Sequence, residues 1–307
     1  MKRQTPRSMR GSASLKAIQQ IAAAAGMIVA SALGAVADDT KIGLVAAENF
    51  YGDVAQQVGG DHIAVVSILN NRDQDPHLFE TTPGIVRQIA HAQIVIFNGA
   101  DYDPWMRRLL DAAPRFGRTV IEVAAVVGKK AGDNPHLWYD PSTMPAVAKA
   151  LAAALSQLDP EHKADYETRL EAFLLSLRPL EQKIAEIRDK YGGSSITATE
   201  PVFGYMADAL KLTTRNARFQ TAVMNDTEPA ARDLAAFEND LKERKVQVLI
   251  YNKQVTSNLT NRLIDVARGA KVAVVGITET EPAGTSYLDW MLRELDALEK
   301  ALQSPRT

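Results

Sequence analysis

Two tripeptides, Asp75-Pro76-His77 and Asn134-Pro135-His136, hold two of the five histidines in this chain of 307 residues. Proline fixes its own φ and biases the preceding residue toward extended backbone, so each imidazole is held in a defined turn. Neutral imidazole is the commonest side-chain metal ligand. Each turn follows a segment typical of a buried strand, and we expect His136 to lie in an exposed turn. The pair favours a metal site built from separate loops over two isolated turn residues.

Carboxylates follow two further predicted strands in the second half of the chain. Glu200 comes after a strand expected at 195–199 and precedes Pro201. It is either a ligand or a helix N-terminal carboxylate favoured by the macrodipole, and the sequence supports both equally. Glu279 and Glu281 follow a strand expected at 272–277. One of these two glutamates would complete a metal site with four ligands. The alternative is that both lie in a solvated loop.

The remaining histidines, His62, His91 and His162, are interpreted as structural or exposed because none lies in a similar turn. The sequence contains no Gly-x-Ser-x-Gly, no Walker A motif and no His-Glu-x-x-His. These patterns carry the nucleophile elbow, the phosphate-binding loop and the helical zinc site of common enzyme classes. Their absence from the sequence argues against those enzymes.

The first 37 residues differ from the rest of the chain. Five basic residues within positions 2–16 precede an uncharged, alanine-rich run at 18–33, and Ala35-Val36-Ala37 fits a cleavage site. This pattern predicts a cleavable signal peptide, with a membrane anchor as the alternative. The chain has no cysteine, which excludes disulfides, thiolate ligands and a lipoprotein anchor. We therefore expect a periplasmic protein that is secreted by a cleavable signal peptide and is not a lipoprotein.

Composition sets limits on partners. Hydrophobic residues make up 46% of the chain and charged residues 23%, a typical globular balance. The formal net charge is −2, and it becomes −7 without residues 1–37. No broad basic surface for nucleic acid is indicated, and the negative charge mildly favours cations.

After residue 37, strands alternate with helices, which predicts βαβ units around mostly parallel sheets. We expect strands at 42–46, 62–69, 94–97, 119–123, 195–199, 246–251 and 272–277. We expect helices at 50–58, 83–90, 104–113, 141–158, 203–210, 229–243, 259–267 and 286–302. Ligands in such sheets bind beyond the carboxyl ends of the strands, where the candidate residues gather.

One long helical pattern, about 160–191, separates the two alternating regions. Its apolar residues recur at helical spacing, and Pro179 within it should kink or divide the helix. The expected organisation is a signal peptide over 1–37, an N-terminal metal-binding lobe over 38–159, a linker helix over 160–191 and a C-terminal metal-binding lobe over 192–307.

These motifs together resemble a known family, the periplasmic zinc- and manganese-binding proteins of metal ABC transporters with a rigid linker helix. The resemblance covers essentially the whole mature chain. It is carried by the segments 75–80 and 134–141, which contain the two histidine turns, and by Thr199-Glu200-Pro201. Glu48-Asn49-Phe50-Tyr51, Asn98-Gly99 and Tyr287 support it.

The resemblance implies two pseudo-symmetric α/β lobes joined by a long backbone helix, with the metal in the cleft between them. It implies four ligands, His77, His136, Glu200 and a carboxylate of the last loop. Glu279 is the nearest match to an aspartate found there in many members, with Glu281 as the alternative. Glutamate in the third position is typical of manganese-binding members. Raw affinity would still rank Zn²⁺ above Mn²⁺, so either ion is expected as the transported ligand.

The function implied is high-affinity capture of a divalent transition metal and its delivery to an ABC permease in the inner membrane. The expected protein is a monomer, binds no nucleic acid and is not an enzyme. The alternative is an exported metal-dependent hydrolase that would use the same residues with a metal-bound water and with Glu48 or Glu281 as base. A third possibility, an adhesin, is described for some relatives, and nothing in the sequence distinguishes it from transport.

Overall fold

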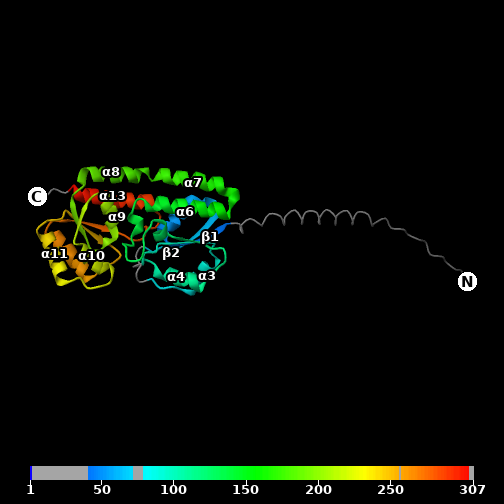
Figure 1. The fold of residues 1–307 in the computed structure, drawn as a ribbon, viewed down its shortest axis with the longest axis horizontal. Coiled ribbons are helices and arrows are strands. Elements are labelled where there is room, and N and C mark those ends of the chain that lie inside the picture. Colours follow the sequence, from blue (N-terminus) through cyan, green and yellow to red (C-terminus); the bar gives the residue numbers. More distant parts are fainter. Residues whose placement is uncertain (2–40, 72–78, 256, 304–307) are drawn as a thin grey trace. The chain divides into compact units, whose positions relative to one another are not determined.

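Two four-stranded sheets, in which every strand pairs parallel to its neighbours, form the framework of the chain. The computed structural model describes residues 41–71, 79–255 and 257–303 together with Met1 (Figure 1). The first sheet has the strand order β2-β1-β3-β4, and the second has the order β6-β5-β7-β8. Their bounds are β1 Ile42–Glu48, β2 Ile63–Leu69, β3 Ile94–Phe97, β4 Thr119–Glu122, β5 Ser195–Ala198, β6 Thr213–Arg215, β7 Val248–Asn252 and β8 Ala273–Ile277.

The central strands are runs of apolar residues buried on both faces. In β1 six of seven residues are buried, and in β3 all four are. Continuous rather than alternating burial is typical of parallel strands covered by helices on both sides. The helices that cover them are α2 Asn49–Gly59, α3 Pro83–His91, α4 Pro104–Ala112, α5 Val123–Val126, α6 Thr143–Leu158, α7 Lys163–Ser176, α8 Arg178–Tyr191, α9 Gly204–Ala209, α10 Ala217–Met224, α11 Ala231–Lys242, α12 Asn258–Gly269 and α13 Tyr287–Leu302.

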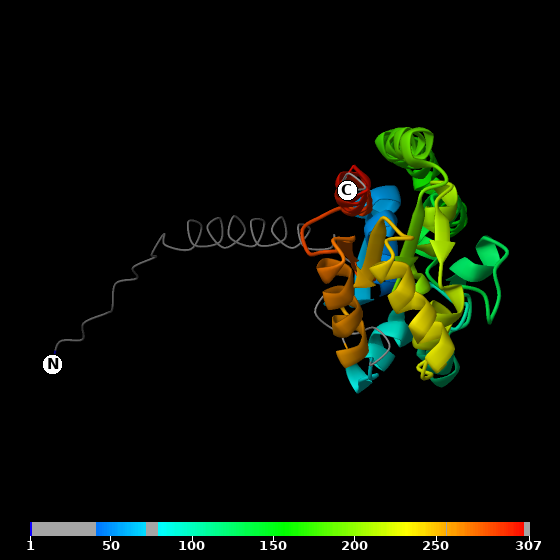
Figure 2. The ribbon, with the colours of Figure 1, turned by 90° about the vertical axis from the view of Figure 1, so that its left-hand side faces the viewer.

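One apolar core serves both sheets. Buried residues of α2, α6, α7, α8, α9 and α13 form one cluster with side chains from strands of both sheets. The opposite face of the first sheet packs on α3 and α4. That of the second packs on α10, α11 and α12, which lie together in Figure 2. We call the first sheet with its helices the first lobe, and the second sheet with its helices the second lobe.

The stretch expected as one long helix is divided. It contains a short 3₁₀ turn, η4 (Pro160–His162), followed by α7 and α8, which meet at Leu177. Pro179 lies in the first turn of α8, where its missing N–H costs nothing. The expected break at Pro179 is thereby confirmed. Lys183 and Lys190 of α8 contact Glu299 of α13 at 2.8 and 3.1 Å, and these ion pairs add to the apolar packing of the two helices.

Among the described helices and strands, three were not predicted from the sequence, α5, β6 and α10. Two of the three residues of β6 are exposed and the third is half-buried, so the strand carries no apolar pattern. The general expectation of two α/β lobes with parallel sheets and a long connecting helical segment is confirmed. No helix among the described residues is long and apolar enough to cross a membrane.

Candidate metal centre

The loop around His136 holds its imidazole in one orientation. The Asn134 carboxamide oxygen accepts the His136 backbone N–H at 3.2 Å and lies 2.7 Å from Nδ1 of the ring. The Asn134 amide donates to the carbonyl of Pro201 at 2.7 Å, which fixes which end of the carboxamide faces the ring. Nδ1 is therefore the donor, and Nε2 keeps its lone pair for a ligand. A second group that fixes the tautomer in this way is usual for metal-binding histidine.

Two expectations about His136 were wrong. The residue is fully buried rather than in an exposed turn, because Trp138 and Tyr102 pack edge-on against its ring. It also does not follow a strand directly, since β4 ends at Glu122 and α5 and a loop intervene. Truncating the His136 side chain would therefore disturb the packing of the core as well as any metal binding.

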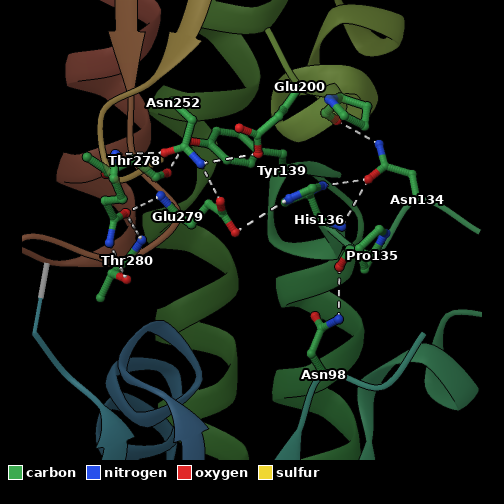
Figure 3. Close-up of polar contacts among 12 residues, drawn as sticks. Asn98, Asn134, Pro135, His136, Tyr139, Glu200, Asn252, Thr278, Glu279 and Thr280 are labelled. Atoms are coloured by element: carbon green, nitrogen blue, oxygen red, sulfur yellow. Dashed lines mark hydrogen bonds and ion pairs between the residues drawn. The ribbon is translucent and has the colours of Figure 1, made fainter. Parts of the chain in front are cut away.

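Glu279 reaches the imidazole from the second lobe. It follows β8, and its backbone N–H and that of Thr280 both donate to the Gln254 carboxamide oxygen, at 2.6 and 3.0 Å. The Glu279 side chain is fully buried, and its Oε2 lies 3.5 Å from Nε2 of His136 (Figure 3). The turn that Gln254 holds thus points a carboxylate at the nitrogen that carries the lone pair.

Glu200 completes the described part of the cluster. It follows β5 in extended backbone and is 4% exposed. The amide of Asn252, the last residue of β7, donates to Glu279 and lies 3.4 Å from Glu200 Oε2. Asn252 was not identified from the sequence, yet it contacts both carboxylates and holds them close together. His136, Glu200 and Glu279 are brought to one place, whereas His77 and its tripeptide lie outside the described residues.

Glu281 lies on another side of its loop. Its backbone N–H donates to the Asn49 side chain at 3.2 Å, and Asn49 donates back to the Glu281 carbonyl at 2.7 Å. Burial raises the pKa of the Glu281 carboxyl to about 9, and the carboxylates of Asp53 and Asp289 raise it as well. This carboxyl therefore faces other acids beside α2 and α13. Of the two glutamates that the sequence left open, Glu279 is the one that contacts His136.

A second pair of acids lies at the carboxyl end of the first sheet. Burial raises the pKa of Glu48, the last residue of β1, well above its ordinary value, and the Asp103 carboxylate raises it further. Asp103 accepts the backbone N–H groups of Asn98 and Gly99 at 2.7 and 2.8 Å, and burial raises its pKa to about 6. The Glu48 carboxyl is therefore shifted toward its protonated, uncharged form.

One polar contact joins the lobes beside the cluster. The Tyr139 hydroxyl lies within hydrogen-bond distance of the Thr278 carbonyl and of the Glu294 carboxyl on α13. Glu294 also accepts from the Trp290 indole at 2.9 Å and from the Thr278 backbone at 3.0 Å. Burial raises the pKa of Glu294 to about 7. The residue before Glu279 is thus fixed from both lobes.

Comparison with known proteins gives the family. A family model described as the zinc-uptake complex component A, periplasmic, matches residues 44–301. The chain belongs to this family. It is accordingly a substrate-binding protein of the metal ABC transporter type, a class of solute-binding proteins rather than enzymes.

Relatives with curated names agree with this assignment. The chain is 24% identical over 299 residues to the manganese ABC transporter substrate-binding lipoprotein PsaA of Streptococcus mitis. This alignment covers 90% of this chain and 94% of PsaA. It is 22% identical over 261 residues to the high-affinity zinc uptake system protein ZnuA of Bacillus subtilis, covering 77% and 80%. The relatives bear the names of manganese and of zinc proteins.

The fold agrees as well. The periplasmic zinc-binding protein TroA of Treponema pallidum superposes with a TM-score of 0.73 and 19% identity, covering 86% of this chain and all of TroA. At this identity the likeness shows the fold alone. The family resemblance inferred from the two histidine turns and the Thr-Glu-Pro motif is confirmed.

Two of the three histidines that were interpreted from the sequence as structural or exposed lie side by side, a contact that was not predicted. His62 and His162 stack with ring centroids 3.9 Å apart, although a hundred residues separate them. Asp159 joins them, and the ligand atoms of the three residues all lie within 4.8 Å of one another. His91 is exposed at the end of α3, as expected.

Proposed function

We propose that this protein binds Mn²⁺ or Zn²⁺ with high affinity as a transported ligand, using His77, His136, Glu200 and Glu279. The observation that carries the proposal is the approach of His136 Nε2 to Glu279 Oε2 at 3.5 Å, both side chains being fully buried. Two carboxylates beside one oriented imidazole form a donor set whose charge a divalent cation would offset. Without such a partner, ionised groups in the interior are costly.

The donor types bear on the choice of ion. Carboxylate oxygens suit harder ions such as Mn²⁺, whereas imidazole suits zinc. Two histidines and two glutamates accept either ion, and the names of the relatives include both metals. Asn134 and Asn252 would act as outer partners that orient His136 and the two glutamates.

The ligands come from both lobes. We assign the N-terminal metal-binding lobe to residues 38–159, the linker to 160–191 and the C-terminal metal-binding lobe to 192–307, after a signal peptide of residues 1–37. Metal captured between the lobes would then be delivered to an ABC permease of the inner membrane by a periplasmic, monomeric protein that is not lipid-anchored. The family description as periplasmic and the relatives' names as substrate-binding proteins support this proposal.

The first experiment is thermal melting of the chelator-stripped protein with Mn²⁺, Zn²⁺, Mg²⁺ or no metal. A ligand of the native state at a hundredfold excess over Kd stabilises it by about 2.7 kcal/mol. We expect a large rise with manganese or zinc and none with magnesium. Equal melting under all four conditions would overturn the proposal.

Binding without turnover is part of the proposal. Phosphatase and esterase assays of the metal-loaded protein should give no more product than the metal alone. Hydrolysis that depends on Glu48 or Glu281 would instead favour the alternative, a metal-dependent hydrolase. Transfer to the permease is tested with membranes that contain it, which should take up metal from the loaded protein faster than from free solution.

A further inference from the structure

A second group of metal-ligating side chains lies on the first lobe, away from His136. His62 ends the 3₁₀ turn η1 (Gly60–His62) before β2, Asp159 follows α6, and His162 ends η4 before α7. Two chain segments, one at His62 and one at 159–162, therefore meet at this point, which we call the corner cluster. Its residues belong to none of the motifs on which the family resemblance rests.

Both histidines of the corner cluster contact a carboxylate, and that of His62 is Asp165, which lies outside the cluster. His162 Nδ1 lies 2.7 Å from Asp159 Oδ2, and His62 Nε2 lies 3.1 Å from Asp165 Oδ2. The ligand atoms of His62, Asp159 and His162 are all within 4.8 Å of one another. Donors to a tetrahedral zinc ion lie about 2.1 Å from the metal and so roughly 3.4 Å from one another, a spacing that the three atoms would reach with shifts of about 1 Å.

The surroundings hold these side chains in place. The imidazoles of His62 and His162 are stacked, and His62 also packs edge-on against the buried ring of Tyr166. The Tyr166 hydroxyl donates to Asp159 Oδ2 at 2.7 Å. Burial alone would raise the pKa of Asp159, but the hydrogen bonds from Tyr166 and His162 hold it below its ordinary value. Asp159 is thus an ionised carboxylate in a fixed position.

We propose that the corner cluster is a second metal site. It would bind zinc, copper or nickel in preference to manganese. Two imidazoles and one carboxylate favour these ions, whereas manganese prefers oxygen ligands. The side chains of His62 and His162 are 24% and 43% exposed, so an ion reaches them directly from solvent and keeps a water in the open position. A bound ion would connect the start of β2 to the corner between α6 and α7. The proposal does not depend on the function of the buried cluster.

The test is calorimetric titration of the chain without residues 1–37, with zinc chloride and, separately, manganese chloride as the probes. His62→Gln and His162→Gln are compared with the parent and with His91→Gln, an exposed histidine outside the cluster that serves as the matched control. We expect the parent and His91→Gln to bind one zinc ion more than either cluster variant, or to bind it at least tenfold more tightly. Manganese titrations should be the same for all four proteins.

Repeating the zinc titration in a variant of the buried cluster distinguishes the corner cluster from the buried site around His136. In His136→Gln, one zinc-binding event should persist, and adding His162→Gln should remove it. Thermal melting without metal shows whether each variant is folded. If His162→Gln is not folded, His62→Gln replaces it in the double variant. Identical zinc isotherms for the parent and both cluster variants would overturn the corner cluster as a site, whatever the manganese titrations show.

Discussion

The two lobes repeat the same arrangement at the carboxyl ends of their sheets but use it differently. Both have the same strand order, and the register of β1 on β3 (Ala46 with Ile96) matches that of β5 on β7 (Ala198 with Ile250). Two residues further along each pair, Glu48 and Asn98 of the first lobe are the counterparts of Glu200 and Asn252 of the second. A glutamate beside an asparagine therefore occurs at the same place in both lobes.

The contacts of these pairs differ. Asn98 donates to the carbonyls of Gly99 and Pro135 and accepts from Tyr51, and Glu48 meets another acid, Asp103. In the second lobe, Asn252 donates instead to Glu279 and contacts Glu200. Asn98 of the first lobe thus supports the His136 loop, whereas Asn252 of the second contacts the side chains of two glutamates. The topology fixes the position of a side chain, whereas its neighbours decide its role.

The largest effect is expected at the carboxylate that contacts His136. Glu279→Gln should weaken manganese or zinc binding by at least about 100-fold, because it removes a charged ligand rather than an outer partner. Glu281→Gln is the matched control, a buried glutamate of the same loop, and should change the affinity by less than about threefold. Calorimetry measures both. Equal effects of the two variants would show that neither is the fourth ligand.

Substitutions of the two equivalent asparagines, Asn98 and Asn252, should have different effects, one on stability and the other on metal affinity. Asn252→Ala should lower metal affinity about 10- to 100-fold, the usual cost of losing an outer partner of a ligand. Asn98→Ala should lower the free energy of unfolding by about 2 kcal/mol, because it leaves the buried Pro135 carbonyl and Tyr51 hydroxyl without their partner. Urea denaturation and calorimetry on both variants check this. If Asn98→Ala reduced affinity as much as Asn252→Ala, the two lobes would not differ in this way.

The paired glutamates should differ in their pH dependence. The pKa of Glu48 is raised in the folded protein above its ordinary value of 4.5. Above pH 4.5 the unfolded chain therefore loses a proton that the folded state still holds. The stability from Glu48 is complete below that value and is lost as pH rises through the folded pKa. Glu48→Gln, which cannot ionise, should therefore gain stability over the parent as the pH rises above 4.5 without metal.

Metal affinity provides the control for this pair. Because Glu48 contacts Asp103 in the first lobe, Glu48→Gln should bind metal like the parent, whereas Glu200→Gln should bind it much more weakly. Urea denaturation at several pH values and calorimetry at pH 7 give the two readouts. A strong loss of affinity in Glu48→Gln would place that residue among the ligands.

The smallest effect concerns a contact from the second lobe to the His136 loop. The Tyr205 hydroxyl of α9 donates to the Asn134 carbonyl at 2.8 Å. Tyr205→Phe should lower the free energy of unfolding by about 1 kcal/mol, the typical value of one neutral hydrogen bond. Thermal melting detects a change of this size. No change in either melting or affinity would mean that the loop is held by Asn134 and Asn98 alone.

Much of the fold and part of the site could be predicted from the sequence. Strands buried on both faces carry long apolar runs, so β1 and β3 were found, whereas the exposed β6 had no such pattern. His136 and Glu200 stood beside prolines at the ends of predicted elements. Asn252 did not stand out, because an asparagine that ends a strand is also typical of an ordinary turn.

Contacts between distant residues account for what the sequence could not show. The choice between Glu279 and Glu281 depends on the pairing of Glu281 with Asn49, more than two hundred residues away. His62 and His162 meet only because α2 packs on α7. Neither contact leaves a local pattern, so the last ligand stayed open and the corner cluster was missed.

The single apolar core under both sheets constrains how a bound ion could leave. Swinging the lobes apart as rigid bodies would wet side chains of that core, and each 200 Å² of apolar surface exposed costs about 5 kcal/mol. The turn that carries Glu279 is held by hydrogen bonds to Gln254, each of which costs only about 1 kcal/mol to break. If metal binds as proposed, its release by local loosening of the Glu279 turn would cost less than separation of the lobes. Small-angle scattering should then give the same radius of gyration with and without metal, while amide exchange in residues 278–285 changes.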